Sequence, residues 1–435
     1  MASLQEAVVK GLAADRGLFM PMTIKPLPQE FYDTIDTLSF QEIAYRVADA
    51  FFGEDIPTDT LKQIVYDTLS FDVPLVKVTD NIYSLELFHG PTLAFKDVGG
   101  RFMARLLGYF IKKEGQKDVN VLVATSGDTG SAVANGFLGV EGIHVYVLYP
   151  KGKVSEIQEK QFTTLGQNIT ALEVDGTFDD CQALVKAAFM DKELNEHLSL
   201  TSANSINVAR FLPQAFYYFY AYAQLKRAGK ADNAVICVPS GNFGNITAGL
   251  FGKKMGLPVK RFIAANNRND IFYQYLQTGK YNPRPSVATI ANAMDVGDPS
   301  NFARVLDLYG GSHADISAEI SGTTYTDEQI RETVKETWKE HHYLLDPHGA
   351  CGYRALQEGL KQGETGVFLE TAHPAKFLET VESIIGEAVE IPAKLQEFMK
   401  GEKKSLQMTK EFADFKKYFC LLYTSPSPRD AHESR

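Results

Sequence analysis

The sequence predicts an α/β protein, with mostly parallel, twisted sheet flanked by helices and a helical N-terminal extension. From about residue 119, short β-rich runs alternate with helical segments, as in parallel βαβ units. Before them, the apolar residues of roughly the first 75 positions recur with helical periodicity. A chain of 435 residues, 44% of them hydrophobic, can form two or three domains around a large core.

The N-terminal extension contains a helix start. Ser39 and Glu42 have the spacing of a capping box, in which each side chain binds the other residue's backbone N–H. We therefore expect a helix that begins near residue 40 and buries one face. The apolar residues of that face are Phe40, Ile43, Ala44, Val47, Ala48 and Phe51.

The β-rich runs that follow are candidate buried strands, with helices expected to begin near Ser155 and Thr326. In sheets of this kind, ligands bind beyond the carboxyl ends of the strands. The residues just after each run are therefore the candidate site. The runs are residues 119–123, 144–148, 234–238 and 367–369.

Composition excludes several classes of protein. The formal net charge of -10 argues against a nucleic-acid surface, which usually needs a basic face. No apolar run approaches the length of a membrane span, and the N-terminus has no basic region followed by a hydrophobic one. Four cysteines without a CxxC pair indicate neither a metal site nor a disulfide framework. We expect a cytoplasmic protein with no metal, nucleic-acid partner or membrane partner.

A glycine-rich segment follows the run at 234–238. Small residues there let backbone N–H groups converge on an anion at a helix N-terminus, which would make a phosphate cradle. A tight turn is the alternative, and a nucleotide is the weaker ligand because neither a Walker A lysine nor a dinucleotide spacing is present. The cradle residues are Ser240, Gly241, Asn242, Phe243, Gly244 and Asn245.

Lys96 lies in a different chemical setting, the segment 86–97. Its apolar turn is bounded by a glycine and a proline. Such a turn can keep an amine desolvated and poorly charged, as a Schiff-base nucleophile requires. The alternative is a solvated surface charge, which most of the 44 basic residues must be.

Segment 86–97 resembles the pyridoxal-phosphate lysine segment of threonine synthases, and the resemblance extends over about residues 4–419. It implies the tryptophan-synthase-β-like fold (fold type II), with two α/β lobes. The implied domains are 1–75, a catalytic core at 76–390 whose smaller lobe covers roughly 100–210, and a C-terminal helical segment at 391–419.

The resemblance also implies how pyridoxal phosphate is held. Lys96 would carry the cofactor covalently, and the cradle at 240–245 would grip its phosphate. Thr371 would face the pyridine nitrogen, and a hydroxyl there leaves that nitrogen largely unprotonated. A side chain near Asp128 would approach the phenolic oxygen.

Two further segments are implied to bind substrate. Thr125, Ser126, Gly127 and Thr129 would clasp its carboxylate, and the alternative for this loop is helix capping by Ser126 or Asp128. Residues 292–297, 299–301 and 346–349 are typical of the family but are given no chemical role. The substrate phosphate would be bound by Asn204, Ser205 and Arg210, because an arginine fork with amide and hydroxyl donors suits phosphate oxygens.

The implied activity converts O-phospho-L-homoserine and water to L-threonine and phosphate, by β,γ-elimination and replacement, in a monomer or homodimer. A related lyase, such as a phospholyase or a threonine or serine dehydratase, and a non-catalytic pyridoxal-phosphate-binding protein are the alternatives. We favour a scaffold role over proton relay for His89. His341 and His342 are assigned to no site, because adjacent rings diverge on a helix.

The chain departs from the family pattern in three places. Arg16 stands where a glycine is usual, which puts the local backbone conformation in question. From the family pattern, we would expect some further residues at the N-terminus. Residues 420–435 resemble a translated sequencing adapter, and we exclude them from the fold as read-through.

Overall fold

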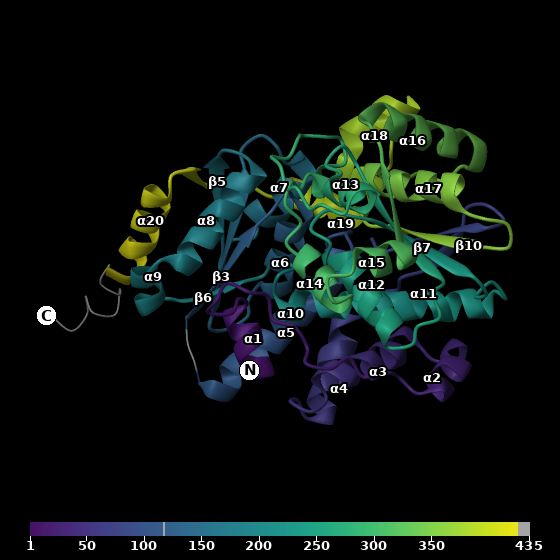
Figure 1. Ribbon diagram of the computed structural model, residues 1–435. Helices are drawn as coiled ribbons and strands as arrows, with labels where there is room; N and C mark the ends of the chain where they lie inside the picture. Colours follow the sequence, from purple (N-terminus) through teal and green to yellow (C-terminus); the bar gives the residue numbers. More distant parts are fainter. Residues whose placement is uncertain (116–117, 425–435) are drawn as a thin grey trace, which may run out of the picture.

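The computed structural model describes residues 1–115 and 118–424 as two sheets with helices packed around them (Figure 1). Strand pairing is parallel throughout both sheets except between β1 (Leu75–Lys77) and β2 (Ile82–Glu86). The predicted α/β class with mostly parallel sheet is therefore confirmed. Residues 425–435, most of the suspected adapter sequence, lie outside the described residues. Residues 420–424, which we expected to lie outside the fold, form the end of helix α20 (Phe412–Thr424).

The larger sheet has six strands in the order β1-β2-β10-β7-β8-β9. Its central strands β7 and β10 are buried at every position, as expected for parallel strands covered on both faces. The candidate strands at 234–238 and 367–369 are these two. The strands of this sheet are β1 (Leu75–Lys77), β2 (Ile82–Glu86), β7 (Ala234–Pro239), β8 (Arg261–Asn266), β9 (Ile320–Thr324) and β10 (Thr365–Glu370).

The smaller sheet has five strands in the order β11-β5-β4-β3-β6. Its strands β3 and β4 contain the predicted runs at 119–123 and 144–148. We expected residues 391–419 to be helical, but β11 lies within them and pairs with β5. The strands are β3 (Val119–Ala124), β4 (Ile143–Pro150), β5 (Ile169–Asp175), β6 (Ser199–Ser202) and β11 (Leu406–Thr409).

The N-terminal extension packs on helices of the catalytic core. In the described chain, α3 contacts α11 (Ala215–Arg227), and α4 contacts both α3 and α5. Phe40 meets the ring of Tyr220 edge-on at 4.5 Å, which continues the core into this extension. The helices up to α5 are α1 (Leu4–Lys10), α2 (Gln29–Thr34), η1 (Ile35–Thr37), α3 (Phe40–Phe52), α4 (Thr58–Thr68) and α5 (Lys96–Glu114).

Helices cover both sheets. α8 contacts β3 and β4 of the smaller sheet, and α17 contacts β7, β8 and β10 of the larger one. The remaining helices are α6 (Asp128–Phe137), α7 (Glu156–Thr163), α8 (Phe178–Met190), α9 (Lys192–His197), α10 (Val208–Phe211), η2 (Leu212–Gln214), α11 (Ala215–Arg227), α12 (Gly244–Lys254), α13 (Ile271–Thr278), η3 (Asn292–Met294), α14 (Phe302–Leu308), α15 (His313–Glu319), α16 (Asp327–His341), α17 (Pro347–Gly359), η4 (Pro374–Phe377), α18 (Leu378–Ile385), α19 (Ala393–Lys400) and α20 (Phe412–Thr424).

The predicted helix starts are confirmed by their hydrogen bonds. At α3, the Ser39 hydroxyl accepts from the Glu42 N–H at 3.2 Å, and the Glu42 carboxylate accepts from the Ser39 N–H at 2.7 Å. Equivalent capping boxes begin α7 at Ser155 and α16 at Thr326. These local bonds explain why the sequence alone located the three helix starts.

Arg16 adopts the left-handed conformation that its glycine-like position suggested, with φ of 71°. Its N–H donates to the Ala13 carbonyl at 2.9 Å, which closes a tight turn. We expect Arg16→Gly to raise the free energy of unfolding by about 1 kcal/mol, because glycine adopts this conformation without steric cost. Urea unfolding would measure the gain, and an equal gain in Arg16→Ala would contradict this explanation.

Candidate active site

One cavity lies at the carboxyl ends of β3, β6, β7 and β10, where the two lobes meet. With its open mouth included it spans about 730 Å³, and charged and polar side chains from several segments converge on it. This position is the one expected for parallel sheets. The expected site residues that line it are Lys96, Ser126, Thr129, Asn204, Ser205, Arg210, Ser240, Gly241, Asn242, Phe243, Gly244, Asn245 and Thr371.

Lys96 is the first residue of α5 and extends into the cavity. Its Nζ lies 5.4 Å from the ring centre of Phe95. The backbone N–H of Phe95 donates to the Thr371 carbonyl at 2.8 Å, which fixes Thr371 beside the lysine. Burial lowers the pKa of Lys96 to about 8, with Arg210 and Lys376 adding to this effect and Asp128 opposing it. Lys96 is thus a partly neutral amine near physiological pH.

The predicted cradle surrounds the N-terminus of α12. Phe243, which precedes this helix, adopts the left-handed conformation with φ of 67°, and this turns the chain into the helix. A Cβ at Gly241 would lie 2.5 Å from the Ala293 carbonyl oxygen, and one at Gly244 would lie 2.7 Å from Ser205 Cβ. The first N–H groups of a helix lack intrahelical partners, so this close-packed loop can present them to an anion.

Neighbouring side chains hold the cradle in place. Asn242 accepts hydrogen bonds from the Ser300 N–H at its side chain and from the Asn301 N–H at its carbonyl. The hydroxyls of Tyr217 and Tyr218 both donate to Asn245 Oδ1, at 2.6 and 2.7 Å. The Asn245 amide nitrogen has no hydrogen-bond partner among the described residues, so it is available to a ligand.

Only some residues of the loop at 125–131 line the cavity. Ser126 and Thr129 line the cavity, whereas Thr125, Gly127 and Asp128 are not among its described lining residues. The Thr125 hydroxyl accepts from the N–H groups of Gly127 and Gly130, at 2.9 and 2.8 Å. The alternative, in which Ser126 or Asp128 caps this helix, is not observed: Gly127 is the cap residue of α6, and the Thr125 hydroxyl binds the N–H of Gly130 in the first turn.

The residues expected to donate hydrogen bonds to the substrate phosphate belong to the segment that follows β6. Asn204 exchanges hydrogen bonds with the backbone of Ala124, which joins the ends of β3 and β6. The Ser205 hydroxyl accepts from Asn301 Nδ2 at 3.0 Å. Arg210 is only 2% exposed; its Nε donates to the Ala203 carbonyl at 2.9 Å and its Nη1 to the Lys96 carbonyl at 3.4 Å. Arg210 thus lies against the backbone of Lys96, and its positive charge acts on the Lys96 amine.

His348 lines the same cavity but was not among the predicted site residues. Its Nε2 accepts from the Ala293 N–H at 3.1 Å, and its Nδ1 lies 2.5 Å from Asp346 Oδ2. This contact joins the segments 292–297 and 346–349, which were assigned no chemical role from the sequence. The signal was present, because Asp346 caps α17 directly before a proline and a histidine.

The remaining histidines of interest lie away from this cavity. Nε2 of His89 is 3.0 Å from Glu86 Oε1, and its ring packs against Phe88, which supports the scaffold role. His341 and His342 end α16. Among the described residues, no group of three or more His, Cys, Asp or Glu could hold a metal ion. Within residues 1–115 and 118–424, no helix is long and apolar enough to span a bilayer.

His373 provides a prediction about stability and pH. Burial lowers its pKa to about 4, while its Nδ1 accepts from the Ala375 N–H at 3.0 Å. The unfolded chain therefore binds more protons at this site between about pH 6.5 and 4, so the free energy of unfolding falls as the pH drops through that range.

His373→Asn should reduce this acid sensitivity, because asparagine can still accept the Ala375 hydrogen bond but does not titrate. We expect the difference to reach about 1 kcal/mol per pH unit. Urea unfolding of both proteins at pH 7 and pH 5 would measure it, and equal losses in the two proteins would show that His373 contributes nothing.

The cavity fits pyridoxal phosphate. It combines an amine of lowered pKa with a backbone cradle that a Cβ at residue 241 or 244 would obstruct. Fold and site together define a pyridoxal-phosphate-dependent enzyme of the two-lobed α/β class. In agreement, the sequence model of the family "Pyridoxal-phosphate dependent enzyme" matches residues 73–371.

Two narrower family models also match, the threonine synthase N terminus at residues 1–69 and the threonine synthase C-terminal region at 349–418. The threonine synthase of Serratia marcescens is 47% identical over 393 residues, covering 90% of each protein. The chain therefore belongs to the threonine synthase family.

Solved structures agree with this membership. The crystal structure of threonine synthase from Escherichia coli superposes with a TM-score of 0.91 at 45% identity, covering 96% of each chain. The pyridoxal-phosphate-bound threonine synthase from Brucella melitensis gives a TM-score of 0.88 at 35% identity, covering 97% of each chain.

Proposed function

We propose that this chain converts O-phospho-L-homoserine and water to L-threonine and phosphate, the last step of threonine biosynthesis. The observation that carries the proposal is the presence of two sets of anion donors around Lys96. The cradle at 240–245 suits the cofactor phosphate, and Arg210 with Ser205 suits the phosphate of a substrate. Relatives named threonine synthase, similar over nearly the whole chain, support the same activity.

Lys96 would act as the base of this reaction. When bound, pyridoxal phosphate supplies an electron sink for the negative charge that develops beside the substrate nitrogen. The Lys96 amine takes the proton from Cα and returns it at the end. An amine with a pKa of about 8 is about 10% neutral at pH 7, far more than an amine that titrates at 10.5. Lowering the pKa thus makes the base available at physiological pH.

The other cavity residues would bind and orient the substrate. Ser126 and Thr129, which line the cavity, would hold its carboxylate with their hydroxyls, and Thr371 beside Lys96 would face the pyridine nitrogen. Arg210 and Ser205 would hold the phosphate as it leaves Cγ, before water adds at Cβ. Because Arg210 is almost fully buried, its hydrogen bonds to phosphate would form in a low dielectric and would be strong.

A dehydratase or a phospholyase would share Lys96 and the cradle, and it remains the second candidate. The donors at Ser205 and Arg210 favour a phosphorylated substrate over free serine or threonine. Incubation with O-phospho-L-homoserine and pyridoxal phosphate distinguishes the candidates when phosphate, threonine and 2-oxobutanoate are measured together. Phosphate and threonine should rise in equal amounts. Phosphate with 2-oxobutanoate would indicate a phospholyase, and release of neither from a folded, cofactor-bound sample would refute the substrate assignment.

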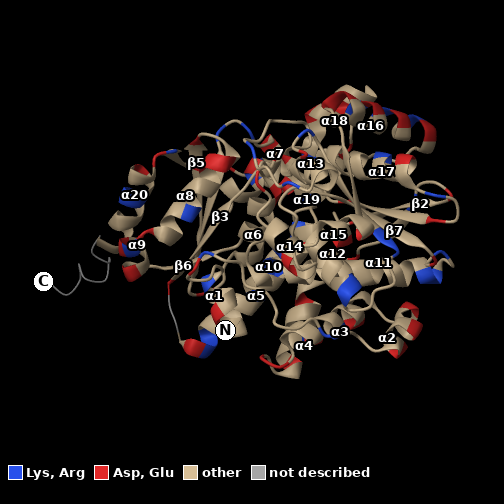
Figure 2. Ribbon diagram, viewed as in Figure 1, with Lys and Arg blue, Asp and Glu red and all other residues tan. Residues whose placement is uncertain are grey.

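The finer biological setting is part of the same proposal. We infer action in the cytoplasm, as a monomer or homodimer, without a nucleic-acid or membrane partner. Three buried free thiols, Cys181, Cys237 and Cys351, suit a reducing compartment. Figure 2 shows acidic and basic residues mixed on outer helices such as α16 and α20, which supports the absence of a nucleic-acid partner.

A further inference from the structure

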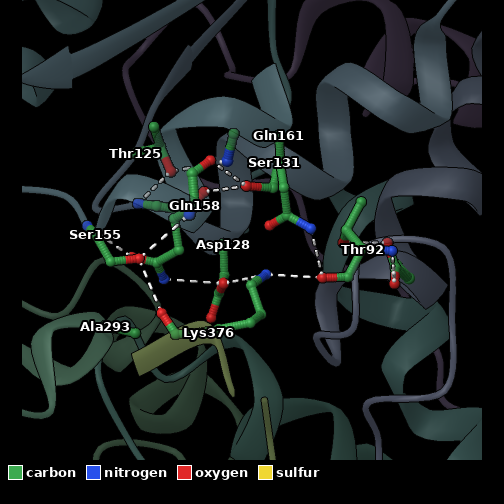
Figure 3. A network of polar contacts seen from close by, with 12 residues as sticks. Thr92, Thr125, Asp128, Ser131, Ser155, Gln158, Gln161, Ala293 and Lys376 are labelled. Carbon is green, nitrogen blue, oxygen red and sulfur yellow. Dashed lines mark hydrogen bonds and ion pairs between the residues drawn. The ribbon is translucent and has the colours of Figure 1, made fainter. Parts of the chain in front are cut away.

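A second buried lysine, Lys376, lies close to the site and is not used by the mechanism above. It belongs to η4, just beyond β10 of the larger sheet, and its side chain is 0% exposed. Its Nζ lies 2.6 Å from Asp128 Oδ1 and donates to the Thr92 carbonyl at 2.8 Å. Figure 3 shows Lys376 reaching between Asp128 and Thr92. Burying an ammonium group destabilises the fold unless the group is paired. We therefore asked what this ion pair contributes to the site.

The pair joins the two lobes. Asp128 begins α6 beside the smaller sheet, and Gln158 Nε2 from α7 donates to the same Oδ1 at 3.0 Å. The Ser155 hydroxyl, which begins α7, donates to the Lys376 carbonyl at 2.9 Å. Lys376 is therefore bound to the smaller lobe through both its side chain and its backbone. These contacts fix the distance between its charge and Asp128.

Hydrogen bonds also connect the pair to the start of α5, the helix that carries Lys96. Thr92, whose carbonyl accepts from Lys376, donates through its hydroxyl and its N–H to the Asp97 carboxylate, at 2.6 and 2.9 Å. Asp97 directly follows Lys96 in α5. The charged groups that act on Lys96 are Asp128 of α6, Arg210 of α10 and Lys376 of η4. The groups that Lys376 itself influences are Lys96, Asp97, Asp128 and His373.

We propose that Lys376 is a positioning residue that engages the negative charge of Asp128, so that Asp128 does not hold Lys96 as an ammonium ion. Without Lys376, Asp128 would be a buried carboxylate without an ion-pair partner, and Lys96 is the other cation that acts on it. With Lys376, Asp128 stays ionised and in place, while Lys96 remains able to lose its proton. The inference rests on the role proposed for Lys96.

Removing Lys376 and removing Asp128 should shift the protonation of Lys96 in opposite directions. Lys376→Met removes a cation and releases Asp128, so Lys96 should hold its proton more tightly. Asp128→Asn removes the anion and leaves Lys376 unbalanced, so Lys96 should hold its proton less tightly. The double variant Asp128→Asn/Lys376→Met removes both charges, so the titration midpoint of Lys96 should stay close to the wild-type value. Lys376→Arg keeps the charge and serves as the conservative control.

Competitive acetylation of the full-length, cofactor-free chain with acetic anhydride measures this directly, because only the neutral amine reacts. Mass spectrometry of the Lys96 peptide across pH gives the midpoint of its titration. We expect the midpoint to rise by at least about one pH unit in Lys376→Met, which is about a tenfold loss of labelling at neutral pH. It should fall in Asp128→Asn and stay near the wild-type value in the other two variants.

Shifts in the same direction for the two single variants, or no shift in either, would overturn the proposal. If Lys376→Met does not fold, Asp128→Asn and the double variant decide: a fall that the double variant reverses supports the proposal, and an unchanged midpoint refutes it. A different experiment shows whether the proposed function itself fails. If Lys96 is not the cofactor lysine, borohydride reduction of the wild-type holoenzyme will attach the cofactor to another lysine, whatever the acetylation midpoints are.

Discussion

Lys96→Ala is expected to abolish turnover and the visible absorption of the bound cofactor. Lys96 places an amine of lowered pKa within the cavity, and the other buried lysine beside the site, Lys376, is already bound to Asp128. Loss of the nucleophile removes both the covalent attachment and the base, so the rate should drop by at least about four orders of magnitude.

The measurement is an absorption spectrum of the purified protein with added pyridoxal phosphate, followed by a phosphate-release assay. The matched control is Lys192→Ala, which removes a surface lysine whose side chain is 90% exposed. This control should keep both colour and turnover. Normal turnover by Lys96→Ala would refute the assignment of the site.

Arg210→Ala is expected to weaken substrate use far more than cofactor binding. Its guanidinium lines the cavity and is almost fully buried, so its bonds to a phosphate would be charge-assisted and poorly screened. Loss of such an interaction corresponds to about a 100-fold fall in kcat/KM. Some stability should also be lost, because the Ala203 carbonyl loses its donor.

Steady-state kinetics with O-phospho-L-homoserine would separate the two effects, with most of the change expected in KM. Arg261→Ala is the control, since it breaks a part-buried ion pair with Glu364 at the start of β8, away from the cavity. It should lower stability and leave KM unchanged. An unchanged KM in Arg210→Ala would place the substrate phosphate elsewhere.

Local signals explain what the sequence could predict. The capping box at Ser39 and Glu42 lies within one helical turn, the buried strand β7 is a continuous apolar run, and β3 is apolar except at Asn120. The cradle at 240–245 follows β7 directly, so its place at the strand end needed only the parallel-sheet rule. Each of these features depends on residues close together in the chain, which a pattern in the sequence can show.

Contacts between distant segments explain what the sequence could not predict. Lys376 and Asp128 are far apart in the chain, and only the packing of η4 against α6 and α7 joins them. The same is true of His348 and Ala293. Strand β11 was missed because most of its residues are exposed, so it lacks the apolar run that marks a buried strand. Thr125 was expected at the substrate carboxylate, but its hydroxyl binds backbone N–H groups of its own loop.

We expect this cavity to hold pyridoxal phosphate on Lys96. Reduction of the holoenzyme with borohydride, followed by proteolysis and mass spectrometry, identifies the lysine that carries the cofactor, because the reduced cofactor stays attached to it. We expect the added mass on the peptide that contains Lys96. Its presence on Lys376 or any other lysine, with Lys96 unmodified, would contradict the account.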